Sequence, residues 1–304
     1  MNNIEPPIHL PVLPKEVRQA SEATTGEIWV DGTAGGGGHT ADLLQAVQPD
    51  GHVIAIDRDP AACLKLRTRF DQQPVTILND SYHHLPLHLD HIAETIRVSK
   101  PLLVDGILLE LGLSSDQLAD RERGFSFHSD GPLDLRYNPQ EGESAAELLR
   151  YIGEEELANI IYQYGEERFS RRIARRIVEQ RRSEPIETAK QLADLIHRSV
   201  PGRVHGRVDS ATRTFQALRI AVNRELEIVE EALRELPKCL KPGGRFVVIS
   251  FHSLEDRLVK HIFREHPLLD VVTKKPIEAS PDEERRNPRS RSAKLRVAKR
   301  RNGE

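Results

Sequence analysis

The sequence predicts an α/β fold in which a doubly wound parallel sheet is interrupted by an inserted helical segment. Short apolar runs without polar alternation, typical of strands buried on both faces, alternate with helical patterns over residues 27–111. The pattern then becomes polar, glycine-rich and helical until about residue 211. A further buried run, RFVVISF at 245–251, follows the helical segment, so the sheet resumes there.

Four strands are expected before the insertion, each a short apolar run: residues 27–31, 52–57, 75–78 and 105–111. The first run ends at Asp31 and the second at Asp57. After the second strand, Asp59 can cap a helix in which Pro60 occupies the first turn. Repeated alternation of strand and helix is typical of a doubly wound sheet.

The insertion, residues 116–211, is expected to form a helical subdomain with a basic face. Phe169, Ile173 and Ile177 fall on one helical stripe, and arginines occupy the remaining circumference. Residues 1–115 and 212–304 are then the two parts of the interrupted domain.

Beyond the insertion, one long amphipathic helix is expected from Thr212 to the KPGG turn at 241–244. Residues 269–273 and 294–298 are expected to close the sheet as a final pair of strands. The acidic and then basic stretch between them, 278–293, is expected to be a mobile loop.

The charge is nearly balanced overall but unevenly distributed. The chain has 44 Lys and Arg against 47 Asp and Glu, a formal net charge of -3. Arg285 to Arg301 holds nine basic residues and no acidic one, and seven arginines crowd residues 168–182. A solvated tail and an exposed helix face would explain either zone alone, but the two zones together favour a nucleic-acid partner.

The two cysteines, Cys63 and Cys239, lie far apart and outside any metal or redox spacing, which indicates free thiols in a reducing compartment. The N-terminus lacks the basic and apolar regions of a signal peptide. No apolar run approaches the roughly 20 residues that span a bilayer. We therefore expect a cytoplasmic protein without a disulfide framework or a membrane association.

Four consecutive glycines follow the first strand, in DGTAGGGGHT at 31–40. A glycine-rich turn at this place lets main-chain N–H groups and the next helix N-terminus approach a ligand closely. Asp57, at the end of the second strand, is placed to accept hydrogen bonds from two ribose hydroxyls. A tight turn with a helix-capping Asp is the purely structural alternative, but context and spacing together favour a ligand that carries ribose.

NAD and S-adenosylmethionine both use this kind of crevice. The dinucleotide pattern would require glycine at position 40 if Gly35 began it, and Thr40 stands there instead. The stretch LKPGGRFVVIS at 240–250 looks like the entrance to the fifth strand of Rossmann-like methyltransferases, which favours the methyl donor. An NAD-dependent oxidoreductase is the first alternative, and a non-catalytic RNA-binding or assembly factor is the second.

The stretch DGILLELGLSSDQLADRERGFSFHSDGPLDLR at 105–136 closely resembles a signature of the bacterial 16S rRNA cytosine-N4 methyltransferases, the RsmH or MraW family. Six other segments resemble the same family in the same order: HLPVLPKEV (9–17), VDGTAGGGGHT (30–40), AIDRDP (55–60), YGEERFSRRIARRIV (164–178), ATRTFQALRIAVNREL (211–226) and ISFHSLEDRLVK (249–260).

The resemblance implies a Rossmann-like class I methyltransferase sheet with an inserted helical subdomain that recognises the RNA substrate. It implies an rRNA (cytosine-N4-)-methyltransferase that uses S-adenosyl-L-methionine to methylate the exocyclic N4 amine of a cytidine in the decoding region of 16S rRNA. The partner is 16S rRNA or the small ribosomal subunit, and a homodimer is left open.

By the same resemblance, the donor-binding residues are Gly37, Gly38, His39, Asp57, Tyr82, Glu110 and Gln117. Tyr82 stands where Phe is usual, and its ring can still pack against adenine. Glu110 stands where the family normally has Asp in D-L-G-V-S-S, so its carboxylate reaches one methylene farther.

Glu110 and His252 are the candidate catalytic residues. The D/N/S-P-P-Y/F element of many amine methyltransferases is replaced here by the sequence ELGLSS at 110–115, so we expect Glu110 and nearby carbonyls to polarise the target amine or the donor's amino group. His252 follows the resumed strand and is the second choice, as the base that takes the proton. Three residues after His252 are also expected to meet the target nucleotide: Ser253, Asp256 and Arg257. Phe251 is a candidate stacking surface for its base. For Ser253, a capping network is an equal alternative.

Extrusion of the target base requires contacts between the protein and the RNA backbone. The candidates are the insertion, the C-terminal tail, Arg203, Arg207 and Arg213. No metal is expected. His84, His88 and His91 share one helical face, but the apolar stripe of that helix places them toward solvent, and no cysteine accompanies them.

Overall fold

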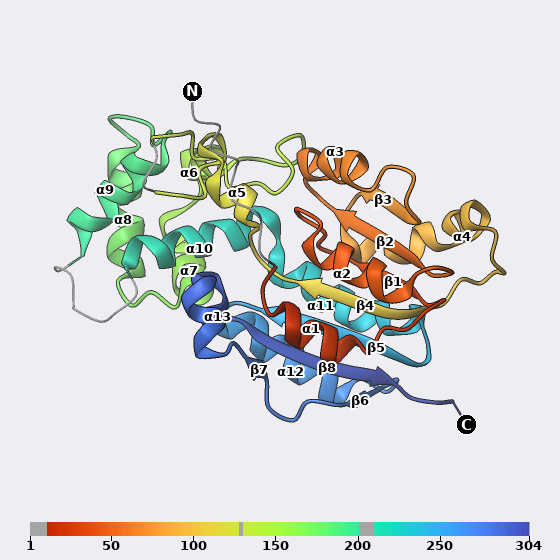
Figure 1. The fold of residues 1–304 in the computed structure, drawn as a ribbon. Coiled ribbons are helices and arrows are strands. Elements are labelled where there is room, and N and C mark those ends of the chain that lie inside the picture. The colour runs from red at the N-terminus through yellow and green to blue at the C-terminus, as the bar shows by residue number, and fades with distance from the viewer. Residues whose placement is uncertain (1–10, 128–129, 201–208, 304) are drawn as a thin grey trace. The chain divides into compact units, whose positions relative to one another are not determined.

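The computed structural model describes residues 11–127, 130–200 and 209–303 (Figure 1). Contacts between Cα atoms divide the chain into two compact units. The first consists of the residues up to Gly112 together with those from Glu227 onward, and the second runs from Leu113 to Leu226.

The first unit contains a single eight-stranded sheet of order β3-β2-β1-β4-β5-β8-β6, with β7 paired to β8. The first five strands pair in parallel, and β8 lies antiparallel between β5 and β6. The strands are β1 (Ile28–Asp31), β2 (His52–Asp57), β3 (Val75–Asn79), β4 (Val104–Glu110), β5 (Leu240–Ser250), β6 (Leu269–Val271), β7 (Ile277–Glu278) and β8 (Lys294–Arg300). The α/β prediction, the four early strands and the closing pair are confirmed.

Helices cover both faces of this sheet. Successive side chains of a strand point to opposite faces, so neighbouring residues join different clusters. On β2, Val53 and Ala55 join one buried cluster, whereas Ile54 and Ile56 join the other. The first cluster includes side chains from α1 (Pro14–Ser21), α2 (Gly38–Val47) and α3 (Pro60–Arg69). The second includes side chains from α4 (Leu85–Ile96), α11 (Glu225–Glu235) and α12 (Ser253–Glu265). Both faces of the strands are therefore buried, which explains their uninterrupted apolar runs.

The second unit is helical and has its own apolar core. It contains α5 (Ser115–Ala119), η2 (Arg121–Arg123), α6 (Ala145–Tyr151), α7 (Glu154–Gly165), α8 (Ser170–Gln180), α9 (Ala189–Ser199) and α10 (Ser210–Asn223). In α8 the predicted stripe is confirmed: Ile173 and Ile177 are fully buried, and Phe169 packs against the same core. The arginines between them are exposed.

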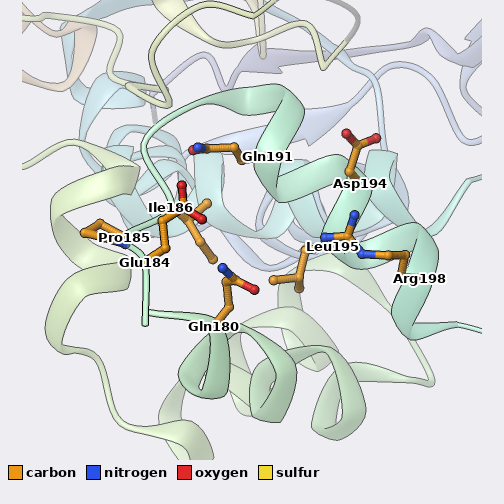
Figure 2. A pocket seen from close by; sticks show the side chains of 8 residues that line it. All are labelled: Gln180, Glu184, Pro185, Ile186, Gln191, Asp194, Leu195 and Arg198. Carbon is orange, nitrogen blue, oxygen red and sulfur yellow. The ribbon is translucent and has the colours of Figure 1, made fainter. Parts of the chain in front are cut away.

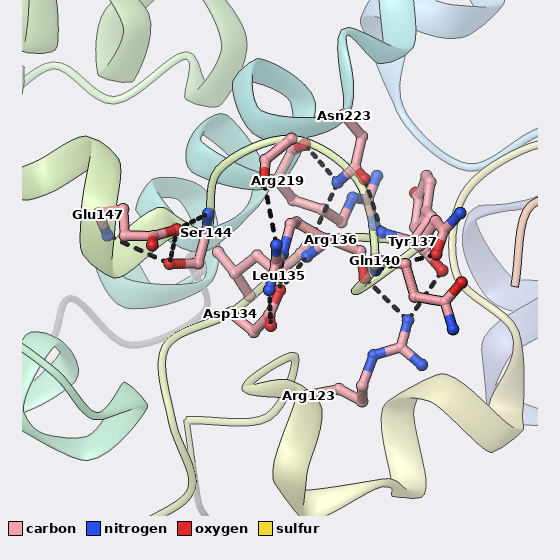
Figure 3. A network of polar contacts seen from close by, with 12 residues as sticks. Arg123, Asp134, Leu135, Arg136, Tyr137, Gln140, Ser144, Glu147, Arg219 and Asn223 are labelled. Carbon is pink, nitrogen blue, oxygen red and sulfur yellow. Dashed lines mark hydrogen bonds and ion pairs between the residues drawn. The ribbon is translucent and has the colours of Figure 1, made fainter.

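A buried asparagine near the end of α10 fixes a polar loop of this unit (Figure 3). The side-chain amide of Asn223 donates to the carbonyl of Leu135 at 2.7 Å and accepts from the N–H of Tyr137 at 2.7 Å. Arg123 donates to the carbonyls of Arg136 and Tyr137 at 2.8 and 2.9 Å. Because Leu135 has a φ of 65°, a conformation that side chains disfavour, the loop depends on these contacts.

The structure differs from the prediction at several points in the last third of the chain. Residues from Thr212 do not form one long helix, because Arg224 adopts a φ of 52° and separates α10 from α11. The second boundary between the units falls after Leu226 rather than at 211, since α10 packs on α6, α7 and α9. Strand β5 begins at Leu240 and includes the Pro-Gly-Gly sequence, with an irregularity where it pairs with β4.

The stretch 278–293 is not a mobile loop but contains α13 (Pro281–Arg286) and the 3₁₀ helix η4 (Pro288–Ser292). The carboxylate of Glu283 accepts a hydrogen bond from the N–H of Leu13 at 2.6 Å. The side chain of Asn287 donates to the carbonyl of Pro11 at 3.3 Å. These contacts with the N-terminal segment order a stretch whose composition alone looked like a loop.

Among the residues that the structure describes, no helix combines the length and apolar character needed to cross a membrane.

We predict that Asn223→Ala destabilises the chain by about 1–3 kcal/mol, because the carbonyl of Leu135 and the N–H of Tyr137 lose their buried partner. Urea unfolding followed by circular dichroism measures the change. Gln140→Ala, at an exposed position of the same loop, is the control and should stay within about 0.5 kcal/mol of the unchanged chain. Equal stability of the two variants would contradict the role given to Asn223.

Candidate functional site

Three carboxylates gather at one edge of the sheet, because each ends a parallel strand. Asp31, Asp57 and Glu110 are the last residues of β1, β2 and β4, which are adjacent strands. In open parallel sheets, the carboxyl edge is where ligands bind. The candidate site is therefore the crevice at this edge of the first unit.

Glycines shape the turn that leads from β1 to α2. A Cβ on Gly32 would lie 2.4 Å from the side chain of Leu109, and one on Gly37 would lie 2.8 Å from the side chains of Leu66 and Phe70. Gly37 also has a φ of 79°. Part of the glycine pattern is thus required by packing within the unit itself and not only by a ligand.

The first turn of α2 presents main-chain N–H groups to the crevice edge. Its N-cap is Gly37, which has no side chain to cap the helix. Gly38 and His39, both predicted site residues, are the first two residues of the helix. An uncapped N-terminus carries partial positive charge and hydrogen-bond donors, so it suits a polar or anionic group of a ligand.

Asp57 is held by the glycine turn. One carboxylate oxygen accepts the N–H of Gly35 at 2.7 Å, and the other accepts the N–H of Asp59 at 2.8 Å. Part of its surface reaches solvent, but burial raises the pKa of Asp57 to about 6 against these two N–H groups, which lower it. An ionised carboxylate has about four acceptor sites, so each oxygen can accept one further hydrogen bond.

His39 and Glu110 meet inside the site. Nε2 of His39 lies 3.2 Å from Oε2 of Glu110, and the N–H of Glu110 donates to the hydroxyl of Thr33 at 2.6 Å. Burial alone would lower the pKa of His39, but the hydrogen bond and charge of Glu110, with the charge of Asp31, raise it above its ordinary value. Nδ1 of His39 is buried and has no hydrogen-bond partner among the described residues.

Asp31 anchors the base of the same site and was not among the predicted site residues. It is buried, and its carboxylate accepts a hydrogen bond from the hydroxyl of Thr40 at 2.6 Å and one from the N–H of Thr33 at 3.3 Å. Burial raises the pKa of Asp31, although these contacts and His39 oppose the shift. Its position at a strand end, next to the glycine turn, was the signal that could have identified it.

Arg289 also reaches the site, and sequence reasoning did not single it out. Its guanidinium lies 3.9 Å from Oε1 of Glu110, whereas His39 lies near the other oxygen, Oε2. It also lies over the ring of Phe251, 6.0 Å from the ring centroid. Nothing in the spacing of the basic tail indicates which of its nine basic residues contacts Glu110.

Tyr82 and Gln117 occupy separate places. Tyr82 belongs to the 3₁₀ helix η1 (Tyr82–His84) after β3, is partly buried, and packs against the core of the first unit. Gln117 lies in α5 of the second unit, where its side-chain oxygen accepts the N–H of Ser114 at 3.1 Å in a capping box. The capping contact gives Gln117 a structural role within its own unit.

His252 caps α12, a role that the sequence suggested for Ser253. Its Nδ1 accepts the N–H of Glu255 at 3.4 Å, and its Nε2 lies 3.1 Å from the Glu255 carboxylate. Asp256 is engaged by Arg296 at 2.7 Å. The polar residues after β5 therefore form a connected network at the start of the helix.

The basic face of the insertion is only partly available for a partner. Arg181 donates to the carbonyls of Leu149 and Ile152 at 2.7 and 2.8 Å, so it stabilises the end of α6. Arg213 lies 3.6 Å from the buried carboxylate of Glu167. In the stretch 168–182, four others are exposed, and their side chains make no salt bridge or hydrogen bond in the described part of the chain: Arg168, Arg171, Arg172 and Arg182. Arg203 and Arg207 lie outside the described residues.

A pocket of the second unit lies between the end of α8 and α9 (Figure 2). Its lining combines the cation of Arg198 with the carboxylates of Glu184 and Asp194. Because the charges are mixed, this pocket has no excess of positive charge to attract a polyanion.

The histidines near α4 bind a carboxylate. Nδ1 of His84 and Nε2 of His88 lie 2.8 and 2.7 Å from the two oxygens of Asp80, while His91 is exposed. Burial alone would raise the pKa of Asp80, but these two hydrogen bonds hold it below its ordinary value. The expected apolar stripe is confirmed, since it is buried: Leu85, Leu89 and Ile92.

The family model and the most similar relatives agree with one another. A family model described as the MraW methylase family matches residues 7–301. A protein of Trichlorobacter lovleyi called ribosomal RNA small subunit methyltransferase H is 46% identical, over 95% of this chain and 97% of its own length. A protein of the same name from a Cyanothece species is 48% identical, over 96% of this chain and 95% of its own.

Among solved structures, a putative rRNA methylase from Clostridium thermocellum aligns over 94% of both chains with a TM-score of 0.45 and 12% identity, a similarity too weak to support a conclusion. The family match spans nearly the whole chain, and the relatives align over nearly their whole length. The chain belongs to the MraW methylase family of S-adenosylmethionine-dependent methyltransferases.

Proposed function

We propose that the chain transfers the methyl group of S-adenosylmethionine to the exocyclic N4 amine of a cytidine in the decoding region of 16S rRNA. The observation that carries the proposal is the crevice itself, where Glu110 lies beside the glycine turn and the uncapped N-terminus of α2. The names of the relatives support the small-subunit rRNA as substrate. The signature at 105–136 supports the cytidine and its position.

The residues of the first unit fit the donor. Asp57 retains one acceptor site on each oxygen for the two ribose hydroxyls. The N–H groups at Gly38 and His39 suit the polar end of the donor, and the buried Nδ1 of His39 offers a further hydrogen bond. The ring of Tyr82 can support the adenine. Gln117 is proposed as a donor ligand on the resemblance alone.

Bound S-adenosylmethionine supplies an activated methyl on its sulfonium, so the protein's main task is alignment of the target nitrogen with the S–CH₃ bond. Glu110 serves this task by accepting an N–H of the target amine, which helps to localise the nitrogen lone pair. His39 and Arg289 face its two oxygens and restrict its movement. We propose that the additional methylene lets the Glu110 carboxylate reach His39.

After Glu110, His252 is the second candidate catalytic residue, as the base that takes the proton lost by the amine. Because Nδ1 accepts the cap hydrogen bond and Nε2 faces the Glu255 carboxylate, the ring must leave the cap before it can take a proton. Transfer of the proton to water would leave the cap intact.

The insertion is proposed to hold the RNA by its backbone. Arg171, Arg172 and Arg182 are exposed and suited to phosphate contacts. We further propose that the protein acts in the cytoplasm, which agrees with Cys63 and Cys239 being free thiols. The family match gives no support to an NAD-dependent oxidoreductase.

The proposed activity predicts that the purified chain transfers tritiated methyl groups from S-adenosylmethionine to small ribosomal subunits that lack the modification. Digestion of the labelled rRNA should place the label on a single N4-methylated cytidine of the decoding region. Subunits that already carry the modification are the control and should accept no label. A labelled nucleotide of another kind would refute the cytidine assignment, and binding without transfer would indicate an assembly factor.

We predict that Asp57→Asn weakens donor binding at least tenfold at neutral pH, because the ribose hydroxyls lose a charged acceptor. In the unchanged chain, donor affinity should fall as the pH drops through about 6, where Asp57 becomes protonated, and Asp57→Asn should lose this pH step. Isothermal titration from pH 5 to 8 measures both effects. Asp71→Asn, which removes an exposed carboxylate of the same unit, should behave like the unchanged chain.

Glu110→Gln is expected to lower kcat about 100-fold, since the neutral amide is a weaker acceptor for the amine and loses the charge that pairs with His39. Glu110→Asp keeps the charge but withdraws it from His39, so we expect an intermediate rate. Single-turnover methyl transfer gives the rates, and titration of the donor gives its affinity separately. Unchanged rate and unchanged donor affinity in Glu110→Gln would remove Glu110 from the mechanism.

A further inference from the structure

Arg289 is held at the crevice by a firmly attached segment. Its helix, η4, follows α13, which is tied to the N-terminal segment through Glu283 and Asn287. Ser290, the next residue, is fully buried and donates from its hydroxyl to the carbonyl of Asn287 at 2.8 Å. Ala293, after the end of η4, is also buried. The backbone of Arg289 is therefore fixed, and its guanidinium has a defined place.

That place lies between two groups which belong to neighbouring strands. Glu110 ends β4 and pairs in register with Ile249 of β5, and Phe251 follows the end of β5. The guanidinium lies 3.9 Å from the Glu110 carboxylate and 6.0 Å from the centroid of the Phe251 ring. The side chain of Arg289 retains 23% of its exposure, so solvent or a ligand reaches it.

We propose that Arg289 binds a phosphate of the RNA strand at the nucleotide that enters the crevice, while the ring of Phe251 supports the extruded base. The inference rests on the proposed RNA substrate. Arg289 is then a substrate-binding residue that lies beside Glu110, the proposed partner of the target amine.

The contact with Glu110 leaves the guanidinium suited to this task. The separation of 3.9 Å between the guanidinium and Oε1 of Glu110 is beyond hydrogen-bonding range, so this contact is electrostatic. Burial lowers the pKa of Arg289, and the charge of Glu110 only partly offsets the effect. A second anion would therefore stabilise the cation, and a phosphate matches the planar fork of N–H donors in a guanidinium.

The location favours RNA over a free anion. Phe251 provides an aromatic face within reach of the same guanidinium, and stacking on aromatic rings is how proteins hold unstacked bases. The segment also carries Arg291, which is exposed. A phosphate at Arg289 would place the attached nucleotide beside Glu110, the proposed partner of the target amine.

The experiment compares Arg289→Ala and Arg289→Met with Arg264→Ala. Arg264 is the control because it is a surface arginine of the first unit outside the basic tail, is 62% exposed and lies 3.2 Å from the surface carboxylate of Glu265. The Met variant keeps the apolar stem of the side chain, so it carries the test if the Ala variant does not fold. The measurements are the KM for unmodified small subunits, its salt dependence, kcat and the affinity for S-adenosylmethionine.

We expect either substitution of Arg289 to raise the KM for subunits about tenfold and to reduce the slope of log binding against log salt by about one, with donor affinity unchanged. Arg264→Ala should change neither quantity. A lower kcat with unchanged KM and salt slope would overturn the proposal and assign Arg289 to the positioning of Glu110. A loss of donor affinity would also overturn it, because Arg289 would then bind the donor's carboxylate. Failure of the proposed function would show differently, as an absence of methyl transfer by the unchanged chain.

Discussion

The parallel pairing of β1 with β2 and β4 is the constraint on which the site depends. Parallel strands end at a common edge, so Asp31, Asp57 and Glu110 are brought together although they are far apart in the sequence. The pairing requires apolar cover on both faces, which the helices provide. A shift of one residue in the register would exchange the two faces of a strand and move its terminal carboxylate away from the others.

Three carboxylates near one another in a buried site oppose their own ionisation, and each is compensated in a different way. Asp31 has the hydroxyl of Thr40, and Asp57 has two main-chain N–H groups. Glu110 has a histidine on one oxygen and an arginine on the other. Burial still raises the pKa of Asp31 and that of Asp57. The site is thus prepared for a ligand that contributes hydroxyl groups and positive charge, as S-adenosylmethionine does.

The arginines of the basic tail have different roles in the structure. They look alike in sequence, yet the structure gives them different tasks. Arg296 neutralises Asp256, Arg286 stays at the surface, and Arg289 reaches the crevice. In the insertion, Arg181 likewise hydrogen-bonds to carbonyls at the end of α6, whereas neighbouring arginines are exposed. A count of basic residues therefore overstates the surface available to RNA, because burial and pairing remove several of them.

The sequence by itself determined the features that depend on neighbours along the chain. The limits of β2, the cap of α3 by Asp59 and the buried stripe of α8 follow from local periodicity and local hydrogen bonds. Strands that are apolar on both faces also implied the parallel sheet, and the resemblance supplied the residues of the donor site.

Only the tertiary structure decided which distant groups meet. The contact of His39 with Glu110, the approach of Arg289 and the folding of 281–292 all arise from segments brought together by the sheet. The break at Arg224 has the same origin. Helix α10 packs within the insertion, whereas α11 packs on the sheet. The apolar periodicity continues through both helices, so it did not predict the turn between them. Local sequence carries no record of such contacts, because their energy comes from burial and charge between residues that are remote along the chain.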